Sequence, residues 1–209
     1  MAPEPHLNGT SGATGVVLAG GKSHRMGRDK LPLMVGKKPL LDRVYLALAS
    51  CCDEILVVGE GGYAPAGAHC IPDLRPGRQG PLAGIEAGLL AARHRAVFVA
   101  AGDIPFLTGD LAGYLLGLLS DDVSAVVSDS GGWLHPLCAA YGREIRPTVS
   151  AALDRGIRSV RELLEDLAGV RFVREEDLRR FGNPDLLLTN VNSPEDLERA
   201  RKAFNGGEG

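Results

Sequence analysis

The chain has 209 residues, of which 44% are hydrophobic and 23% are charged, proportions that are ordinary for a soluble globular protein. Its formal net charge of -3 and the lack of a Lys/Arg-rich block give no sign of a nucleic-acid-binding surface. No apolar run approaches the ~18 residues of a membrane span. We therefore expect one domain with a substantial core, and neither a nucleic-acid nor a membrane partner.

The first 14 residues, MAPEPHLNGTSGAT, are polar and rich in proline and glycine. They lack the apolar centre of a secretory signal, so we expect a flexible tail at 1–14 and a single domain at 15–205. The four cysteines show no metal-ligand spacing, and the adjacent pair at 51 and 52 is not a C-x-x-C motif. Reduced thiols in a cytoplasmic protein are the expected state.

Residues 15–30, GVVLAGGKSHRMGRDK, pass from an apolar strand-like run into a basic, glycine-rich loop. The letters GKS at 21–23 match the end of a P-loop, but that template needs a glycine where this chain has Val16. Val16 lies in a β-branched run, which favours extended backbone. A glycine and a proline then fall where the P-loop helix would run, so the sequence argues against a P-loop nucleotidase.

The same loop remains a candidate phosphate site of another kind. Gly20 and Gly21 carry no Cβ, so their backbone N–H groups can approach an anion closely. Arg25, Arg28 and Lys30 add positive charge within ten residues. A triphosphate is the natural partner of such a loop, and a solvated basic loop without a ligand is the alternative.

Strand-like and helix-like segments alternate along the chain. We expect strands at 15–19, 54–58, 68–71, 96–100, 123–127, 136–141, 170–173 and 185–191, and helices at 39–50, 80–94, 108–119, 144–155, 160–168 and from Ser193 onward. The strands at 123–127 and 136–141 are a candidate β-hairpin around a loop at 128–135. This alternation predicts an α/β fold, a three-layer sandwich with a mostly parallel central sheet. Ligands of such sheets bind at the carboxyl ends of the strands.

Three polar loops are then expected at one edge of the sheet: the glycine loop, AGDIPF at 101–106 and NVNSP at 190–194. Asp103 follows an apolar strand, where a carboxylate is well placed to hold Mg²⁺ against phosphates; a simple turn aspartate is the alternative. Asn190 and Asn192 lie two residues apart on an extended segment, so their side chains point the same way. An asparagine-rich turn into the last helix is the alternative for them.

Two other patterns are weaker indications of function. VVGEGGYA at 57–64 fits G-x-G-x-x-A, but Pro65 and a short strand follow it instead of the helix that a dinucleotide-binding fold needs. His135 precedes Pro136 after a glycine-rich loop and has no obvious nucleophile paired with it. It either contacts an anionic substrate or shapes the turn.

The motifs LAGGKSHRMGRDK, GPLAGI, GDIPFL, HPL and NVNSPEDL appear in this order within positions 15 to 198. Together they resemble the molybdenum cofactor guanylyltransferases, which belong to the nucleotidyltransferases with a Rossmann-like fold. LAGG with RMG.DK is typical of sugar- and cofactor-nucleotidyltransferases, and GPLAG with NVNSPEDL narrows the resemblance to the molybdopterin branch. Cytidylyl relatives tend to carry LAAG in the first loop, so LAGG favours guanine.

The resemblance implies Mg²⁺-dependent transfer of GMP from GTP to molybdopterin, with release of pyrophosphate. It also implies transient contact with molybdenum cofactor delivery proteins or molybdoenzymes. It assigns catalytic roles to Arg25, Lys30 and Asp103, with Asp103 holding the metal. It places His135, Asn190 and Asn192 beside the acceptor or the metal. The residues that it implies for nucleotide binding are Leu18, Ala19, Gly20, Gly21, Lys30, Asp73, Gly80, Pro81, Leu82 and Asp103.

The chain departs from the family pattern at three points, one of which is that its first loop runs RMGRDK without the extra residue that some members insert. VVGEGG lacks an asparagine that often helps to hold the nucleotide, and Gly102 stands where a cysteine often precedes the metal aspartate. The alternatives are cytidylyl transfer to molybdopterin, nucleotidyl transfer to a sugar phosphate, and a non-catalytic cofactor-binding protein. Lys30 and Asp103 argue against the last, because a binder has little need for a metal carboxylate beside the phosphates.

Overall fold

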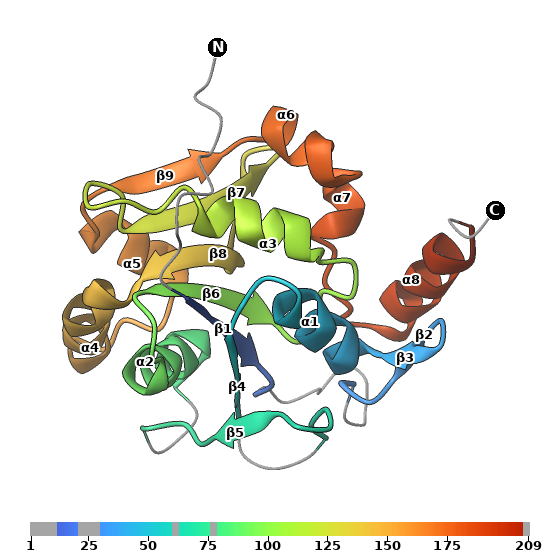
Figure 1. Ribbon diagram of the computed structural model, residues 1–209, viewed down its shortest axis with the longest axis horizontal. Helices are drawn as coiled ribbons and strands as arrows, with labels where there is room; N and C mark the ends of the chain where they lie inside the picture. The colour runs from blue at the N-terminus through green and yellow to red at the C-terminus, as the bar shows by residue number, and fades with distance from the viewer. Residues whose placement is uncertain (1–11, 21–29, 60–62, 76–78, 207–209) are drawn as a thin grey trace.

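A seven-stranded sheet forms the middle layer of the computed structural model, which describes residues 12–20, 30–59, 63–75 and 79–206 (Figure 1). Its strands are β1 (Ala13–Leu18), β4 (Glu54–Val58), β5 (His69–Ile71), β6 (Ala96–Ala101), β7 (Ala125–Ser130), β8 (Trp133–Gly142) and β9 (Val170–Val173). They lie in the order β5-β4-β1-β6-β8-β7-β9. A separate hairpin pairs β2 (Met34–Val35) with β3 (Lys38–Pro39).

The sheet is mostly parallel, as the alternation of elements predicts. β5, β4, β1 and β6 all run in one direction. β8 is antiparallel to both β6 and β7, and β7 is parallel to β9. β8 is thus the reversed strand, and the carboxyl ends of the other six lie at one edge.

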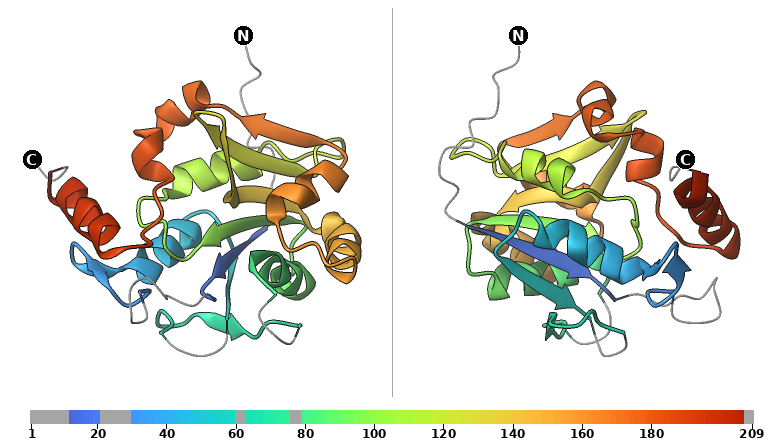
Figure 2. Two further views of the ribbon diagram at one scale, coloured as in Figure 1. Left: turned by 180° about the vertical axis from the view of Figure 1, so that it is seen from behind. Right: turned by 45° about the vertical axis from the view of Figure 1, so that its right-hand side comes forward.

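Helices cover both faces of the sheet, which gives the predicted three layers (Figures 1 and 2). One core cluster joins the sheet to α1 (Leu40–Ala49), α3 (Gly109–Leu116), α6 (Glu175–Leu178) and α7 (Pro184–Leu187). The other joins it to α2 (Pro81–Ala91), α4 (Arg146–Asp154) and α5 (Val160–Asp166). Two short 3-10 turns, η1 (Arg143–Ile145) and η2 (Arg179–Phe181), complete the set with α8 (Pro194–Gly206).

Successive side chains along a strand point to opposite faces of the sheet, so each strand contributes to both cores. On β1, Val16 faces the α2 side while Val17 faces the α1 side. Gly88 lets α2 lie close to β1, because a Cβ at that position would come within 2.6 Å of Val16 Cγ1. Close packing of this kind makes α2 buried on nearly every side, from Leu82 to Leu89.

Two sequence-based expectations are wrong in this region of the fold. The segment 185–191 is not a strand: Asn183 caps a short helix by accepting a hydrogen bond from Asp185 N (3.1 Å), and Pro184 fills its first turn. The β-hairpin of the strands at 123–127 and 136–141 is confirmed, but the loop expected at 128–135 is too long: β7 and β8 run through most of it and meet at Gly131 and Gly132, with φ of 59° and 80°. Positive φ at both positions suits a tight hairpin turn, which glycine permits.

The predicted start of the last helix at Ser193 is confirmed. Ser193 Oγ accepts a hydrogen bond from Asp196 N (3.2 Å), and Asp196 Oδ2 accepts one from Ser193 N (2.9 Å), which is a capping box. This helix, α8, packs on the β2–β3 hairpin through a small third core that contains Val35 and Val191. Among the described residues, no helix has the length and apolar character to cross a membrane.

Candidate active site

The carboxyl ends of neighbouring strands are joined by backbone hydrogen bonds just beyond the sheet. Ala19 N donates to Val58 O (2.8 Å), and Gly102 N donates to Leu18 O (3.0 Å). A Cβ at Gly102 would lie 3.2 Å from Leu18 O and 2.9 Å from Leu41 Cδ1, so glycine allows this close approach. The loops after β1, β4 and β6 therefore leave the sheet side by side.

Lys30, Asp103 and Asn192 meet at this edge although they are far apart in the sequence. Lys30 Nζ lies 2.5 Å from Asp103 Oδ2 and 2.8 Å from Asn192 Oδ1. The side chains of Lys30 and Asp103 are only 18% and 12% exposed, so the ion pair is largely shielded from water. The predicted convergence of the three loops is confirmed.

A main-chain hydrogen bond to the Asp103 loop holds the 190–194 segment in place. Val191 N donates to Asp103 O (2.9 Å), and the side chain of Val191 is buried in the third core. Asn190 and Asn192 are exposed on either side of it, as the extended pattern predicts. The asparagine segment is thus fixed to the aspartate loop by a main-chain bond as well as by Lys30.

These side chains have the donor chemistry that Mg²⁺ prefers. Mg²⁺ favours hard oxygen ligands and is often held by one or two carboxylates together with substrate phosphates. Asp103 offers a carboxylate and Asn192 an amide oxygen around the same amine. Within the described ranges, no three His, Cys, Asp or Glu side chains gather as a metal site by themselves. A divalent ion held by Asp103 would need phosphate or water oxygens as further ligands.

The residues implied for the nucleotide lie beside this cluster. Leu18 ends β1 and Ala19 and Gly20 follow it, and a Cβ built at Gly20 would meet no described residue within 4 Å apart from its chain neighbours. A Cβ at Gly84 of α2 would lie 3.0 Å from Leu18 Cδ2 and 3.7 Å from Asp73 Oδ1, so Asp73 neighbours the end of β1. The structure therefore brings these predicted residues together.

The N-terminus of α2 borders the same edge. Gly80 precedes the helix with φ of 80°, a conformation that favours glycine, and Pro81 occupies the first turn. Leu82 is fully buried in the core, which leaves only its backbone for a ligand. The remaining predicted positions, Gly21 and Arg25, lie outside the described residues.

His135 lies on β8, opposite Ser128 of β7, at the hairpin end of the sheet. It is half-buried, and this burial lowers the pKa of its imidazole below the ordinary value, although Asp129 acts in the opposite direction. The imidazole is therefore neutral at pH 7. A neutral ring can donate or accept a hydrogen bond but adds no charge against an anionic substrate.

Sequence reasoning missed an ion-pair network behind the nucleotide loop. Arg75 forms a bidentate ion pair with Glu86 of α2, in which Nε donates to Oε2 at 2.7 Å and Nη2 donates to Oε1 at 2.8 Å. Its Nη1 also lies 2.6 Å from Asp154 Oδ1 of α4. The available signal was Glu86 itself, a lone carboxylate in the apolar run PLAGIEAGLLA. Arg75 thereby ties the segment that follows Asp73 to two helices.

A family model described as the MobA-like NTP transferase domain matches residues 15–170, which is more than half of the chain. The chain belongs to this family. A molybdenum cofactor guanylyltransferase from Desulfosudis oleivorans is 34% identical to it, over 93% of this chain and 96% of the relative. A probable molybdenum cofactor guanylyltransferase from Pelotomaculum thermopropionicum is 36% identical, over 90% of this chain and 92% of the relative.

Solved structures agree with the family assignment. The molybdopterin-guanine dinucleotide biosynthesis protein A from Archaeoglobus fulgidus superposes with a TM-score of 0.78 at 27% identity, covering 92% of this chain and 99% of that one. The 2-C-methyl-D-erythritol 4-phosphate cytidylyltransferase from Thermus thermophilus shares the fold, with a TM-score of 0.66 at 20% identity, over 91% and 98% of the two chains. The MobA-like chain is thus a nucleotidyltransferase with the predicted fold.

Proposed function

We propose that this MobA-like protein transfers GMP from GTP to molybdopterin, releasing pyrophosphate and forming the guanine dinucleotide cofactor. The observation that carries the proposal is the Lys30–Asp103–Asn192 cluster at the carboxyl edge of the sheet. It lies beside the residues that end β1, in a chain whose relatives are named molybdenum cofactor guanylyltransferases. The function is further proposed to operate in the cytoplasm, with transient contact to molybdenum cofactor delivery proteins or molybdoenzymes.

The reaction needs charge neutralisation more than it needs a base. The acceptor is a phosphate monoester with a second pKa near ~6, so it is already largely anionic at neutral pH. Its oxygen would attack the α-phosphate in line, and pyrophosphate would leave. Two anions repel each other on approach, so the protein lowers the barrier by positioning them and by offsetting their charge.

Lys30 is the described residue best placed to supply that positive charge. Its amine is held by Asp103 and Asn192, and a bound triphosphate would compete for the same amine. Asp103 would hold Mg²⁺ with help from Asn192, and the metal when bound supplies further charge neutralisation at the phosphates. Asn192 can orient the Lys30 amine without adding charge of its own.

The nucleotide would lie along the end of β1. There Leu18, Ala19 and Gly20 offer backbone groups, and apart from its chain neighbours no described residue lies within 4 Å of where a Cβ of Gly20 would be. Asp73 and the Gly80–Pro81 start of α2 border the same space from the other side. Gly21 and Arg25 are proposed to contribute from the loop that follows β1. His135, Asn190 and Asn192 would then face the acceptor.

The experiment that tests the proposal is pyrophosphate release by the purified chain with Mg²⁺, molybdopterin, and either GTP or CTP in parallel reactions. Release with GTP alone is the expected result. Release with CTP would keep the fold and the chemistry but overturn the base assignment. No release with either nucleotide, from folded protein and an acceptor that is active with a known guanylyltransferase, would contradict the proposal.

A further inference from the structure

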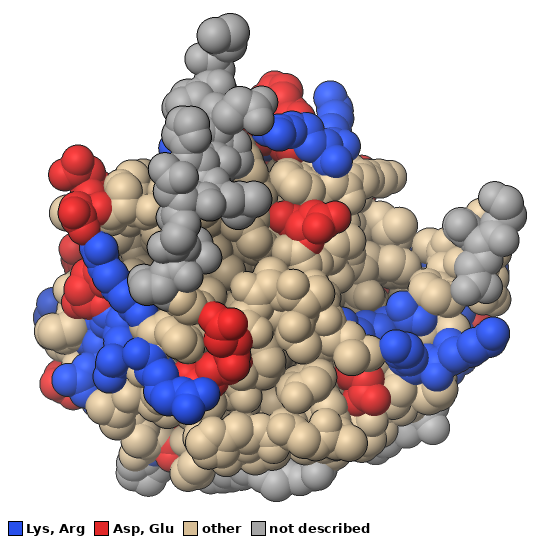
Figure 3. All heavy atoms as spheres, viewed as in Figure 1, with Lys and Arg blue, Asp and Glu red and all other residues tan. Residues whose placement is uncertain are grey.

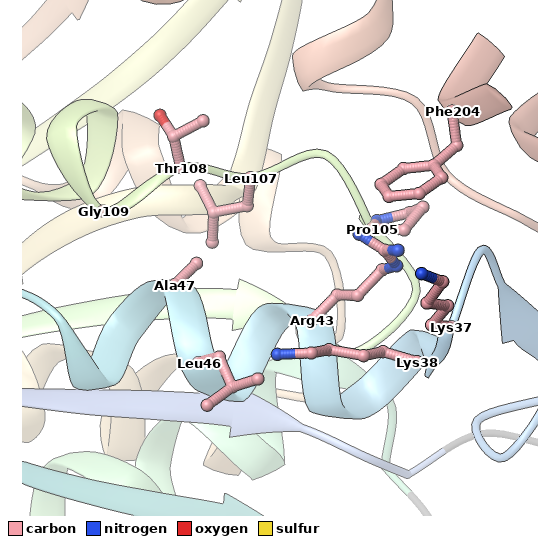
Figure 4. A pocket seen from close by; sticks show the side chains of 10 residues that line it. All are labelled: Lys37, Lys38, Arg43, Leu46, Ala47, Pro105, Leu107, Thr108, Gly109 and Phe204. Carbon is pink, nitrogen blue, oxygen red and sulfur yellow. The ribbon is translucent and has the colours of Figure 1, made fainter. Parts of the chain in front are cut away.

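A hollow of about 460 Å³ lies outside the site described above, between α1, the β2–β3 hairpin, the loop before α3 and the end of α8 (Figure 4). It shares no residue with the Lys30–Asp103–Asn192 cluster. Its lining residues are Lys37, Lys38, Arg43, Leu46, Ala47, Pro105, Leu107, Thr108, Gly109 and Phe204. Pro105 and Leu107 belong to the GDIPFL motif, but none of the residues assigned above to the nucleotide, the metal or the acceptor lines this hollow.

Among the described residues, every charged side chain that lines the hollow is a cation. Lys37 and Lys38 are exposed, and neither forms an ion pair with any part of the chain that the structure describes. Figure 3 shows lysine and arginine side chains gathered over the hairpin end of the molecule. In a chain with a net charge of -3, this is a local concentration of positive charge. Such a concentration attracts anions.

One wall of the hollow is fixed by packing. Arg43 Nε donates to Val35 O (2.7 Å), and the guanidinium lies 3.9 Å from the centre of the Phe204 ring. Gly36 allows the hairpin turn to approach both side chains, because a Cβ there would lie 2.3 Å from Phe204 and 2.8 Å from Arg43. The φ of Gly36 is 60°, a conformation that also favours glycine. The cation is thus held in place before any ligand arrives.

The opposite side of the hollow is apolar. Figure 4 shows Leu46, Ala47 and Leu107 together on one side, with the amine of Lys38 reaching toward Leu46. Leu46 is 44% exposed, which is high for a leucine in the middle of a helix. An exposed apolar surface bordered by three cations offers contacts for a molecule that has both an apolar body and a negative group.

We propose that this hollow binds a small organic anion, in which a carboxylate, sulfonate or phosphate is joined to an aromatic or aliphatic body. Its volume lies within the roughly 300–1,000 Å³ of small-molecule sites. The anionic group would lie among Lys37, Lys38 and Arg43, and the apolar body would cover Leu46 and Leu107. The ligand site is separate from the proposed nucleotide site, so a test of one does not depend on the outcome of a test of the other.

Two fluorescent probes test the site on the full chain: 8-anilinonaphthalene-1-sulfonate, and N-phenyl-1-naphthylamine, which has the same apolar body but no charge. The sulfonate should bind saturably, and Lys37→Ala with Lys38→Ala should weaken its binding by about tenfold. Lys202→Ala, an exposed lysine of α8 outside the hollow, should leave it unchanged. Equal binding of the two probes, or equal binding by the double variant, would overturn the proposal.

A second pair of variants tests the apolar side. Leu46→Asp places a negative charge in the hollow, whereas Leu90→Asp places one on α2 at a leucine of similar exposure, 42% against 44%. Both positions are exposed, so both variants should fold. The sulfonate should no longer bind to Leu46→Asp and should still bind to Leu90→Asp. Binding that survives in Leu46→Asp would show that the probe occupies another part of the protein.

Discussion

The Lys30–Asp103 contact is the residue-scale feature on which the proposed chemistry depends. Its two partners lie 73 positions apart in the chain, and their side chains are largely shielded from water. Their meeting could be predicted from the sequence, because both follow strands whose carboxyl ends share one edge of a parallel sheet. The hydrogen bond from Lys30 to Asn192 could not, since the sequence gives no distances.

Replacing Lys30 with alanine should lower the rate of transfer by roughly 100-fold or more, because the charge that offsets the phosphates is lost. The variant should remain folded, with a thermal midpoint close to that of the parent chain. Single-turnover rates with GTP and molybdopterin would measure the loss, and Lys202→Ala is the matched control. A Lys30→Ala chain with the parent rate would contradict the assigned role.

His135 should titrate below the ordinary histidine value of ~6.5, because burial disfavours its charged form. The unfolded chain then binds the proton more readily, so this histidine destabilises the fold as the pH falls below about 6.5. His135→Gln should therefore gain stability relative to the parent between about pH 6.5 and 5 and show no such gain at pH 8. Chemical denaturation at these pH values measures the difference. A gain of equal size at every pH would refute the titration argument.

At the scale of elements, the Arg75–Glu86 pair joins the β5–α2 connection to the buried helix behind it. Glu86 is 6% exposed, and a carboxylate so placed needs a partner. The sequence contained the lone Glu86 but not the identity of its partner. Arg75 lies in a loop eleven residues earlier, and only the folded path of that loop brings the two together.

Arg75→Met should lower the thermal midpoint by more than about 4 °C, because it leaves Glu86 buried without its partner. Adding Glu86→Leu should restore most of the loss, since a matched apolar pair replaces the ion pair. Arg95→Met removes an exposed arginine that also contacts two acids, and it should change little. If the double variant is no more stable than Arg75→Met alone, the buried charge is not the cause.

The same pair has a pH signature. Hydrogen bonds from Arg75 hold the pKa of Glu86 below its usual range, although burial acts in the opposite direction. The stabilisation is fully present above the unfolded value of ~4.3 and is lost as the pH falls through the lower folded value. The difference in stability between the parent and Arg75→Met should accordingly shrink below about pH 4. A difference that stays constant down to pH 3 would contradict this linkage.

Elements with one dominant signal were predicted well, and those with competing signals were not. α1 buries Leu40, Leu41, Val44 and Leu48, the leucine and valine face that its periodicity predicts. The segment 185–191 failed, because a short apolar run suits a strand as well as a buried turn of helix. The signal that distinguishes helix from strand here is the Asn183–Pro184 pair, which caps and begins a helix.

At the scale of the whole molecule, alternation of strands and helices was enough to predict the three layers but not the order of the strands. β8 enters between β6 and β7 and runs against both. The hairpin with β7 could be read from the sequence, but no local pattern in the ten residues of β8 reveals its pairing with β6. That placement matters for function, because it brings the β7–β8 hairpin and His135 to the edge where β6 delivers Asp103. Tertiary pairing, rather than propensity, decides this part of the site.

In the proposed reaction the α-phosphoryl group of GTP, with its guanosine, moves to the acceptor at Asp103. This transfer is tested most directly by following GTP labelled at the α-phosphate, with molybdopterin and Mg²⁺, in the parent chain and in Asp103→Asn. We expect the parent to place the label on the pterin dinucleotide and the folded variant to leave it on GTP. Label that stays on GTP in the parent would rule out the transfer, and label that reaches the acceptor equally well in Asp103→Asn would rule out the role of Asp103.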